Sequence, residues 1–488
     1  MENRALTPIF VAFLAGATAV LGFAPFEFFP AALASFALLI HLWSRAASPR
    51  AAFALGFWFG IGLFGAGVSW VYVSLHRFGA MPAPLAALAT LGFCGFLALF
   101  PALAGWSQAR LPQSELRPLA IPALWVLLEW LRGWILTGFP WLALGYAAID
   151  WPLAGFAPLG GVFLVSLMAM IAAALLQSIA AGRARWLAAA AFALIGAGGA
   201  ALRGLEWSQP EGAPLSVALL QGNIPQDLKF DPARYARTLE TYARLAEASA
   251  ARLIVLPETA VPRFLDRVDP AYLERLEAAA RRNGGDLLLG VPVRTGGGEY
   301  FNSVLSLGVA PRQTYHKVHL VPFGEFVPPG FGWITERLRI PLSDFSRGSP
   351  AQKPLAVAGQ RAALNICYED AFGAELARAL PEATLLVNVS NVAWFGDSLA
   401  PAQHLQIGRM RALETGRMLL AATNSGLTAA VDRDARVLAQ LAPFSEGRLE
   451  VEARGYGGAT PYVRFGDWPV LALCAAMLLV FALARRNR

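Results

Sequence analysis

The chain carries little charge and little cysteine for its length. Of its 488 residues, 15% are charged and 56% are hydrophobic, and the mean hydropathy is +0.48. Soluble domains carry about 25% charged residues, so this composition indicates a membrane protein. Two of the three cysteines, Cys94 and Cys474, lie in apolar runs, where a thiol serves as a small hydrophobe. Cys367 then has no partner, which excludes a disulfide framework around it.

The basic charge lacks the features of nucleic-acid binding. The net charge is +7 and the pI is about 9.6, but no basic stripe or RNA-binding motif is visible. Many arginines instead flank apolar runs, as the positive-inside rule expects. We also expect no metal site and no cofactor: His316 and His319 are three residues apart in an extended segment, and no third ligand motif accompanies them.

Eight apolar runs are candidates for membrane spans, which need about 20 predominantly apolar residues. They cover residues 6–23, 29–43, 52–75, 83–106, 118–135, 152–181, 186–202 and 468–484. The first run has the look of a signal peptide, but six more runs follow it, so we expect it to be a retained anchor. The sequence therefore predicts a seven-span domain at 1–203, a polar domain at 204–467 and a C-terminal membrane helix at 468–488.

The arginines predict the orientation of these spans. If the N-terminus lies inside, the inside loops carry ten arginines: Arg4, Arg45, Arg50, Arg110, Arg117, Arg183, Arg185, Arg485, Arg486 and Arg488. The short outside loops carry only Arg77 and Arg132. This bias predicts an inner-membrane protein whose two termini are cytoplasmic and whose polar domain is periplasmic.

The polar block alternates strand-like and helix-like segments. Runs at 215–221, 252–258, 285–293, 303–308, 361–367 and 384–390 are short and apolar, as buried strands are. Segments 231–252, 269–284 and 401–417 have the period of amphipathic helices. The first two begin with Asp-Pro, which is typical of a cap followed by proline in the first turn. This alternation predicts a layered α/β domain.

Three reactive residues follow predicted strands, where sites gather in layered α/β folds. They are Glu258, Lys317 and Cys367. Each alone has an ordinary explanation: a helix cap or solvated acid, a surface lysine, a core cysteine. Two acids directly follow the Cys367–Tyr368 pair, and acids raise the pKa of a thiol. A nearby Lys317 would offset them, and Glu258 could take the thiol proton.

The motifs that carry these residues resemble a known family. The order Glu, Lys, Cys on "LPETA", "HKVHLVPFGEF" and "NICYE" is similar to the nitrilase superfamily. "QGNIPQ", "VPFGEFVP", "NVAWFG", "GRMRALE" and the membrane motif "GFPWLALGY", with seven spans before and one after, resemble the apolipoprotein N-acyltransferase family. This resemblance implies an αββα sandwich beside a multi-pass helical membrane domain.

The resemblance also implies residue roles. Glu258 would be the general base, Lys317 the electrostatic stabiliser and Cys367 the nucleophile. Glu325 matches an auxiliary acid whose ordinary alternative is a solvated loop acid. Tyr368 would support the site, with its main-chain N–H as an oxyanion donor.

Glu369 matches a supporting residue of the family, as Tyr368 does. Two further positions lie where the sequence departs from the family pattern. Phe230 stands where the family often has tryptophan, so the aromatic contact is kept but an indole hydrogen bond is not. Trp394 is expected in a substrate loop, although Val392 replaces the acid often found before it.

The family's activity, as implied here, is acyl transfer from a phospholipid, expected to be phosphatidylethanolamine, to the α-amine of a diacylglyceryl-modified N-terminal cysteine of an apolipoprotein. The path would be ping-pong through a Cys367 thioester, in a monomer. Two alternatives stay open: a membrane-tethered amidase or nitrilase, and a non-enzymatic lipid-binding scaffold.

Several intramembrane and loop features are also hypotheses at this stage. Glu129 and Arg132, three apart in one span, would form an ion pair or contact substrate. The aromatic loop around Trp141 is expected at the membrane interface, and the segment around Trp333 is a candidate lid.

Overall fold

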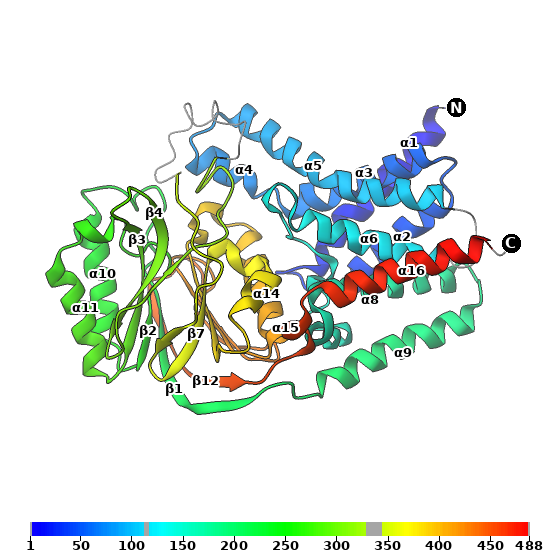
Figure 1. The fold of residues 1–488 in the computed structure, drawn as a ribbon. Helices are drawn as coiled ribbons and strands as arrows, with labels where there is room; N and C mark the ends of the chain where they lie inside the picture. Colours follow the sequence, from blue (N-terminus) through cyan, green and yellow to red (C-terminus); the bar gives the residue numbers. More distant parts are fainter. Residues whose placement is uncertain (1, 112–116, 328–343, 487–488) are drawn as a thin grey trace. The chain divides into compact units, whose positions relative to one another are not determined.

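The computed structural model describes residues 2–111, 117–327 and 344–486 (Figure 1). The chain divides into two compact units. The helical unit comprises Met1–Tyr72, Pro82–Leu205 and Arg464–Arg488, and the α/β unit comprises Val73–Met81 and Glu206–Val463. The segment Val73–Met81 therefore belongs with the α/β unit although it lies between two apolar helices in sequence. The predicted lid residue Trp333 lies outside the described residues.

A helix occupies each of the eight predicted apolar runs. These helices are α1 (Glu2–Ala19), α2 (Phe29–Ser44), α3 (Pro49–Gly67), α5 (Ala83–Arg110), α6 (Arg117–Arg132), α8 (Ala157–Ala180), α9 (Arg185–Arg203) and α16 (Trp468–Arg486). Four described helical segments are long and apolar enough to cross a membrane: Pro49–Gly67, Ala83–Arg110, Pro152–Ala180 and Arg185–Arg203. The apolar helices Leu6–Gly22, Phe29–Ser44 and Trp468–Leu483 are shorter.

Helix α3 is shorter than predicted. The apolar run was expected to continue as one span to residue 75, but the helix ends at Gly67 because Val68 has non-helical angles (φ −128°, ψ 19°). Helix α4 (Val71–Val73) and a π-helical turn, η2 (Ser74–Phe78), follow. Apolar composition alone did not reveal this break.

Small residues let the helices of this unit approach closely. A Cβ added at Gly16 of α1 would lie 1.9 Å from the carbonyl oxygen of Phe59 in α3. A Cβ added at Gly56 of α3 would lie 2.3 Å from the carbonyl oxygen of Pro101 in α5. Such small-residue contacts are the usual means by which helices associate in lipid.

Glu129 and Arg132 both fasten the aromatic loop to α6. Glu129 Oε1 accepts hydrogen bonds from the Leu144 N–H at 2.9 Å and the Trp125 indole at 3.3 Å. Arg132 Nη1 donates to the carbonyls of Phe139 at 2.6 Å and Trp141 at 2.7 Å. The two side chains thus provide hydrogen-bond partners for main-chain groups between residues 139 and 144.

Trp141 is buried inside the protein, and its position at the membrane interface stays a prediction. Its side chain is only 1% exposed. The ring contacts Trp70 at a centroid distance of 5.3 Å and stacks on Phe139 at 6.0 Å. The Arg132 hydrogen bonds to the loop carbonyls explain this burial, because they hold the loop against α6.

Two six-stranded sheets form the α/β unit. The first has the order β12-β1-β2-β3-β4-β5 and the second β11-β10-β9-β8-β7-β6. Strands β1, β2 and β3 are parallel, as are β7, β8 and β9, and the remaining pairs are antiparallel. Their bounds are β1 (Gln209–Gln221), β2 (Leu253–Val255), β3 (Asp286–Arg294), β4 (Tyr300–Gly308), β5 (Thr314–His316), β6 (Leu355–Val357), β7 (Gln360–Ile366), β8 (Leu385–Ser390), β9 (Leu419–Thr423), β10 (Ala429–Val431), β11 (Val437–Gln440) and β12 (Gly447–Gly457).

The two sheets share a central core, and helices cover their outer faces (Figure 1). Alternate residues of β1 divide between the layers: Val217 and Leu219 lie between the sheets, while Ala218 and Leu220 contact the helices α10 (Tyr235–Glu247) and α11 (Pro270–Arg282). Helix α14 (Ala400–Thr415) packs on the second sheet. This arrangement confirms the predicted layered α/β domain, and it follows from the two-residue period of strand side chains.

The predicted start of one helix needs correction. Helix α10 begins at Tyr235 rather than at the Asp231–Pro232 pair, because Asp231 accepts a hydrogen bond from the Ala233 N–H in a preceding turn. Asp269, by contrast, caps α11 as predicted, accepting from the Ala271 N–H at 2.9 Å.

Helix α14 is buried on nearly every side and is not amphipathic. Its polar side chains find partners within the unit, which is why the polar pattern was misleading. Arg411 Nη2 lies 2.9 Å from Glu414 Oε1 on the same helix. Arg409 Nε donates to the carbonyl of Ala435 at 2.9 Å.

Candidate active site

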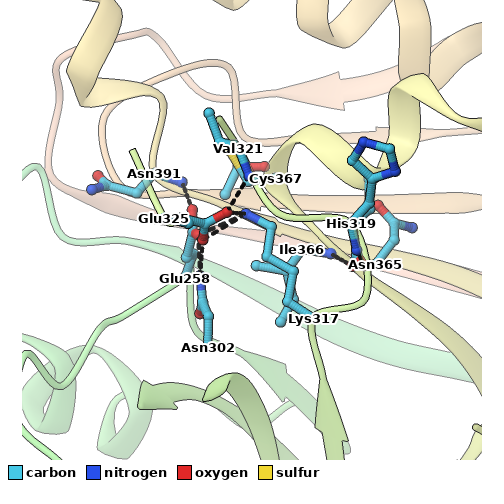
Figure 2. Close-up of polar contacts among 12 residues, drawn as sticks. Glu258, Asn302, Lys317, His319, Val321, Glu325, Asn365, Ile366, Cys367 and Asn391 are labelled. Atoms are coloured by element: carbon cyan, nitrogen blue, oxygen red, sulfur yellow. Dashed lines mark hydrogen bonds and ion pairs between the residues drawn. The ribbon is translucent and has the colours of Figure 1, made fainter. Parts of the chain in front are cut away.

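The ends of three strands bring Glu258, Lys317 and Cys367 together (Figure 2). Glu258 follows β2 and Lys317 follows β5 in the first sheet, while Cys367 directly follows β7 in the second. Lys317 Nζ lies 3.6 Å from Glu258 Oε1. The charges of Lys317 and Glu258 both act on the Cys367 thiol. The three residues that the sequence singled out are therefore neighbours across the junction of the two sheets.

Lys317 is a buried and strongly paired cation. Its side chain is 1% exposed. Nζ donates to Glu325 Oε1 at 2.9 Å and lies 2.8 Å from Glu325 Oε2. Burial alone would lower the pKa of Lys317, but the charges of Glu325 and Glu258 raise it above the ordinary lysine value. Lys317 therefore carries a fixed positive charge.

Glu325 is anchored by more than the lysine. Asn302 Nδ2 donates to Glu325 Oε1 at 2.8 Å, and the Val321 N–H donates to Oε2 at 2.9 Å. The solvated loop acid that the sequence left open is thus not the arrangement found, since Glu325 is buried.

Glu258 is held as a carboxylate. It accepts hydrogen bonds from Asn302 Nδ2 at 2.7 Å and from the Asn391 N–H at 2.8 Å. Burial would raise the pKa of Glu258, but the charges of Lys317 and Lys229 outweigh it and keep this pKa below the usual value. An ionised carboxylate beside a thiol can accept its proton.

The surroundings of the Cys367 thiol favour its protonated form. Burial and the Glu258 charge raise its pKa well above the ordinary value, and the opposing effect of Lys317 offsets only part of this. The sequence-based expectation that Lys317 would cancel the acids is thus only partly correct. A neutral thiol beside an ionised base requires proton transfer during attack rather than a preformed thiolate.

Cys367 has a strained backbone that two side chains secure. Its φ of 55° lies in the left-handed region, which is costly for a residue with a Cβ. Asn388 Nδ2 donates to the Cys367 carbonyl at 3.1 Å, and His404 Nε2 lies 3.1 Å from the same oxygen. His404 also lies 3.0 Å from Asp370 Oδ1. His404 therefore links the Cys367 main chain to Asp370.

Glu369 organises the chain that carries Lys317. Its buried carboxyl accepts hydrogen bonds from the N–H groups of Val318 at 2.6 Å, His319 at 3.0 Å and Ile366 at 2.7 Å. Burial raises the pKa of Glu369 to about 7, although Lys317 and these N–H groups act in the opposite direction. Glu369 thus ties the segment after β5 to the end of β7.

Tyr368, Phe230 and Trp394 occupy separate surroundings. The Tyr368 ring packs against Phe372 at a centroid distance of 5.0 Å. Phe230 is half-buried in a turn that follows β1. Trp394 lies in a short 3-10 helix, η8 (Val392–Phe395).

The Trp394 loop has partners that sequence reasoning missed. Ser74 Oγ donates to the Trp394 carbonyl at 2.8 Å. The Phe78 ring meets the Trp394 ring edge-on at 6.1 Å. Both residues come from the η2 turn, which belongs to the α/β unit. No local signal in the sequence connects this turn with a loop more than 300 residues later.

Lys229 is the second residue that sequence reasoning missed. It is 3% exposed, and its Nζ donates to the main-chain carbonyl of Glu258 at 3.1 Å. The sequence offered one indication that Lys229 is unusual: lysine is rare in this chain, which has only Lys229, Lys317 and Lys353. Two of these three are buried, which is rare for lysine.

No group of three or more histidine, cysteine, aspartate or glutamate side chains that could hold a metal occurs among the described residues. His316 Nδ1 lies 2.7 Å from Ser303 Oγ, and His319 Nδ1 lies 3.2 Å from Glu375 Oε2. These histidines therefore have ordinary polar partners.

Two protein families match this chain, one in its N-terminal part and one in its α/β unit. The family described as apolipoprotein N-acyltransferase N-terminal domain matches residues 15–175, and the carbon-nitrogen hydrolase family matches residues 216–461. The apolipoprotein N-acyltransferase of Nitrosomonas europaea is 51% identical over 98% of this chain and 97% of its own. That of Chromobacterium violaceum is 47% identical over 98% of this chain and 94% of its own. Among solved structures, the C. elegans NitFhit protein is 19% identical with a TM-score of 0.40, covering 51% of this chain and 62% of that one.

Proposed function

The chain belongs to the apolipoprotein N-acyltransferase family, and we propose that it transfers an acyl chain from a phospholipid to an apolipoprotein. The acceptor is the α-amine of the diacylglyceryl-modified N-terminal cysteine. The observation that carries this proposal is the buried arrangement of Glu258, Lys317 and Glu325 around the Cys367 thiol. It supplies a base, a fixed cation and a nucleophile in one place.

The first half-reaction forms a thioester. Cys367 Sγ attacks the ester carbonyl carbon of the phospholipid while its proton passes to Glu258. The oxyanion that develops is stabilised by the Lys317 ammonium and by the Tyr368 main-chain N–H. The intermediate then collapses, the carbon–oxygen bond breaks, and the lysophospholipid leaves with the proton from Glu258.

The second half-reaction consumes the thioester. The neutral α-amine attacks the thioester carbonyl and forms a second tetrahedral intermediate. Glu258 accepts a proton from the amine nitrogen and returns it to the sulfur as the carbon–sulfur bond breaks. The products are an amide and the Cys367 thiol, so no external proton or electron is needed.

The resting thiol fits this order of events. A thiol with a raised pKa does not react with every electrophile that enters the site. Glu258 can accept its proton only when a carbonyl is in place to accept the sulfur electrons. Limiting water around the thioester would preserve it until the amine arrives. Phe230 and Trp394 are proposed contacts for the lipid chains, and Tyr368 and Glu369 are proposed supports of the site.

The setting of the reaction is part of the same proposal. The apolar helices and the arginine bias support a bacterial inner-membrane protein with cytoplasmic termini and a periplasmic catalytic unit. Phosphatidylethanolamine is the proposed donor, and the protein is proposed to act as a monomer.

A decisive experiment supplies both substrates to the purified protein. Phosphatidylethanolamine and a diacylglyceryl-cysteine peptide should give triacylated peptide with wild-type protein and with Cys94→Ser, whose thiol is buried among apolar residues. Cys367→Ala should give none. Persistent product from Cys367→Ala would refute the mechanism.

The same assay separates the alternatives. A membrane-tethered amidase or nitrilase would release free fatty acid or cleave amides without forming triacylated peptide. A non-enzymatic scaffold would leave Cys367→Ser fully functional in cells. Mass spectrometry of Cys367 after incubation with phospholipid alone should reveal an acyl adduct, and its absence would contradict the ping-pong order.

A further inference from the structure

Two buried lysines flank Glu258, and they differ in their hydrogen-bond partners. Lys317 Nζ contacts both oxygens of Glu325 and lies 3.6 Å from Glu258. Lys229 Nζ has a single hydrogen-bond partner within the described part of the chain, the uncharged main-chain carbonyl of Glu258 at 3.1 Å. An ammonium has three N–H donors, so two donors of Lys229 remain without a protein acceptor there. This arrangement is expensive for a purely structural cation.

The charge balance of the site depends on Lys229. Glu258 and Glu325 contribute two negative charges, and Lys317 contributes one positive charge. With Lys229 as an ammonium the four groups are neutral, and without it they carry one net negative charge. Cys367 must itself become negative as its proton leaves. Once the proton has passed to Glu258, the thiolate and Glu325 carry two negative charges and Lys317 carries one positive charge. Like charges in a poorly solvated site repel strongly, so the transferred state needs the second cation that Lys229 supplies.

We propose that Lys229 is a positioning residue for acylation of Cys367: anchored to the main chain of Glu258, it supplies the second positive charge that lets the sulfur lose its proton. This inference rests on the proposed function, since it takes Cys367 as the nucleophile and Glu258 as the base. Lys229 neither gives nor takes a proton during the step. It acts through the field at Cys367 and through the position of Glu258.

The surroundings of Lys229 also make it sensitive to pH. Burial lowers the pKa of Lys229 to about 8, although the charges that face it, Glu258 beyond β2 and Cys367 at the end of β7, act to raise it. The second cation is therefore present below about pH 8 and lost above it. Acylation should slow as the pH rises through this range, whereas a reaction limited only by thiol ionisation would accelerate.

Two substitutions separate the charge from the hydrogen bond. Lys229→Gln keeps a donor that can reach the Glu258 carbonyl but has no charge. Lys229→Arg keeps a charge that does not titrate below pH 12. Lys353→Gln is the matched control, because Lys353 is the remaining lysine and is exposed.

The first measurement is the initial rate of lysophospholipid release from phosphatidylethanolamine vesicles between pH 6 and 9.5. Wild type and Lys353→Gln should slow above about pH 8. Lys229→Gln should be about tenfold or more slower at pH 7, as expected for loss of a nearby opposite charge, and should not show that decline. Lys229→Arg should also lack the decline while being faster than Lys229→Gln at pH 9. A Lys229→Gln enzyme with the wild-type rate and the wild-type decline would overturn the inference.

The second measurement needs no acyl transfer. Iodoacetamide should alkylate Cys367 about tenfold more slowly in Lys229→Gln than in wild type at pH 7, because the thiolate is less stable. Equal rates would overturn the inference even if the proposed function holds. Conversely, a wild-type protein that never releases lysophospholipid would refute the proposed function, while the alkylation comparison would still measure the charge of Lys229 at Cys367.

A third measurement uses the wild-type protein, so its result does not depend on whether the variants fold. Selective isotope labelling of lysine side chains gives three sets of NMR signals, one for each lysine. One set should titrate near pH 8 and should shift when Cys367 is alkylated. Titration of all three sets at ordinary lysine values of about 10.4 would overturn the inference.

Discussion

Replacing Glu325 with glutamine should cripple the site without changing its size. In the wild type, Glu325 Oε1 accepts from Lys317 and Asn302, and Oε2 accepts from the Val321 N–H and contacts Lys317 at 2.8 Å. A glutamine oxygen can replace only one of these acceptors. Its NH₂ group would face either Asn302 or the Val321 N–H, so donors would oppose donors. Lys317 would then retain Glu258, 3.6 Å away, as its nearest carboxylate.

The magnitude follows from the burial of this pair. Removing one partner of a buried ion pair costs about 3–5 kcal/mol of stability. The lower end, about 3 kcal/mol, is expected here because Glu258 still offsets part of the Lys317 charge. Lys317 drawn towards Glu258 would further lower the pKa of this carboxylate and weaken it as a base. We therefore expect acyl-enzyme formation to fall about 100-fold, which corresponds to about 2.7 kcal/mol of activation free energy.

Two assays on the same preparations test this reasoning. Lysophospholipid release measures the rate, and the thermal unfolding midpoint compares stability. Glu325→Asp is the control, since it keeps the charge with a shorter reach and should retain more activity than Glu325→Gln. A Glu325→Gln protein with wild-type rate and midpoint would refute the proposed electrostatic role. An Asp variant as inactive as the Gln variant would show that reach, and not charge, is decisive.

Three further outcomes are expected. Burial lowers the pKa of His404, but the Asp370 carboxylate raises it above the ordinary value. This pair therefore stabilises the fold fully below about pH 6.5 and less as the pH rises through the raised pKa. The difference in thermal midpoint between wild type and His404→Gln should shrink over that pH range, and a constant difference would contradict this expectation. Ser74→Ala removes the 2.8 Å hydrogen bond to the Trp394 carbonyl, worth about 1 kcal/mol, and should speed amide hydrogen exchange around Trp394 about fivefold, whereas unchanged exchange would argue that the η2 turn does not hold this loop. The pH dependence of wild-type alkylation should place the pKa of Cys367 above the usual thiol value of about 8.5, and a lower value would favour a preformed thiolate.

The layered fold was predictable because strands that are buried on both faces form short apolar runs. The segments 361–367 and 384–390 were expected as strands, and they coincide closely with β7 and β8. Their ends also predicted where reactive side chains would gather, since strands of one layer end together. Local patterns could therefore indicate that each of these reactive residues follows a strand. They could not indicate that the residues meet, because Cys367 follows a strand of the second sheet and Glu258 and Lys317 follow strands of the first.

What the sequence concealed depends on contacts between distant segments. Helix α14 looked amphipathic because arginine and glutamate usually face water, but Arg411 and Glu414 pair with each other inside the unit. The burial of Lys229 is not marked by any local pattern, because it depends on the contact with the Glu258 carbonyl, which tertiary folding creates. The η2 turn lies between two apolar helices, and its contact with Trp394 depends on tertiary folding.

The acids that follow Cys367 and Tyr368 do not suppress the nucleophile in the way that their sequence position suggests. Glu369 directs its carboxyl to three main-chain N–H groups, and Asp370 pairs with His404. Both contacts hold the turn in which Cys367 adopts its left-handed conformation, since His404 also reaches the Cys367 carbonyl. The pKa of the thiol is raised chiefly by burial and by Glu258, the same group that is placed to remove its proton. The negative charge of Glu258 therefore opposes ionisation of Cys367 only until Glu258 accepts the proton, because this carboxylate then becomes neutral.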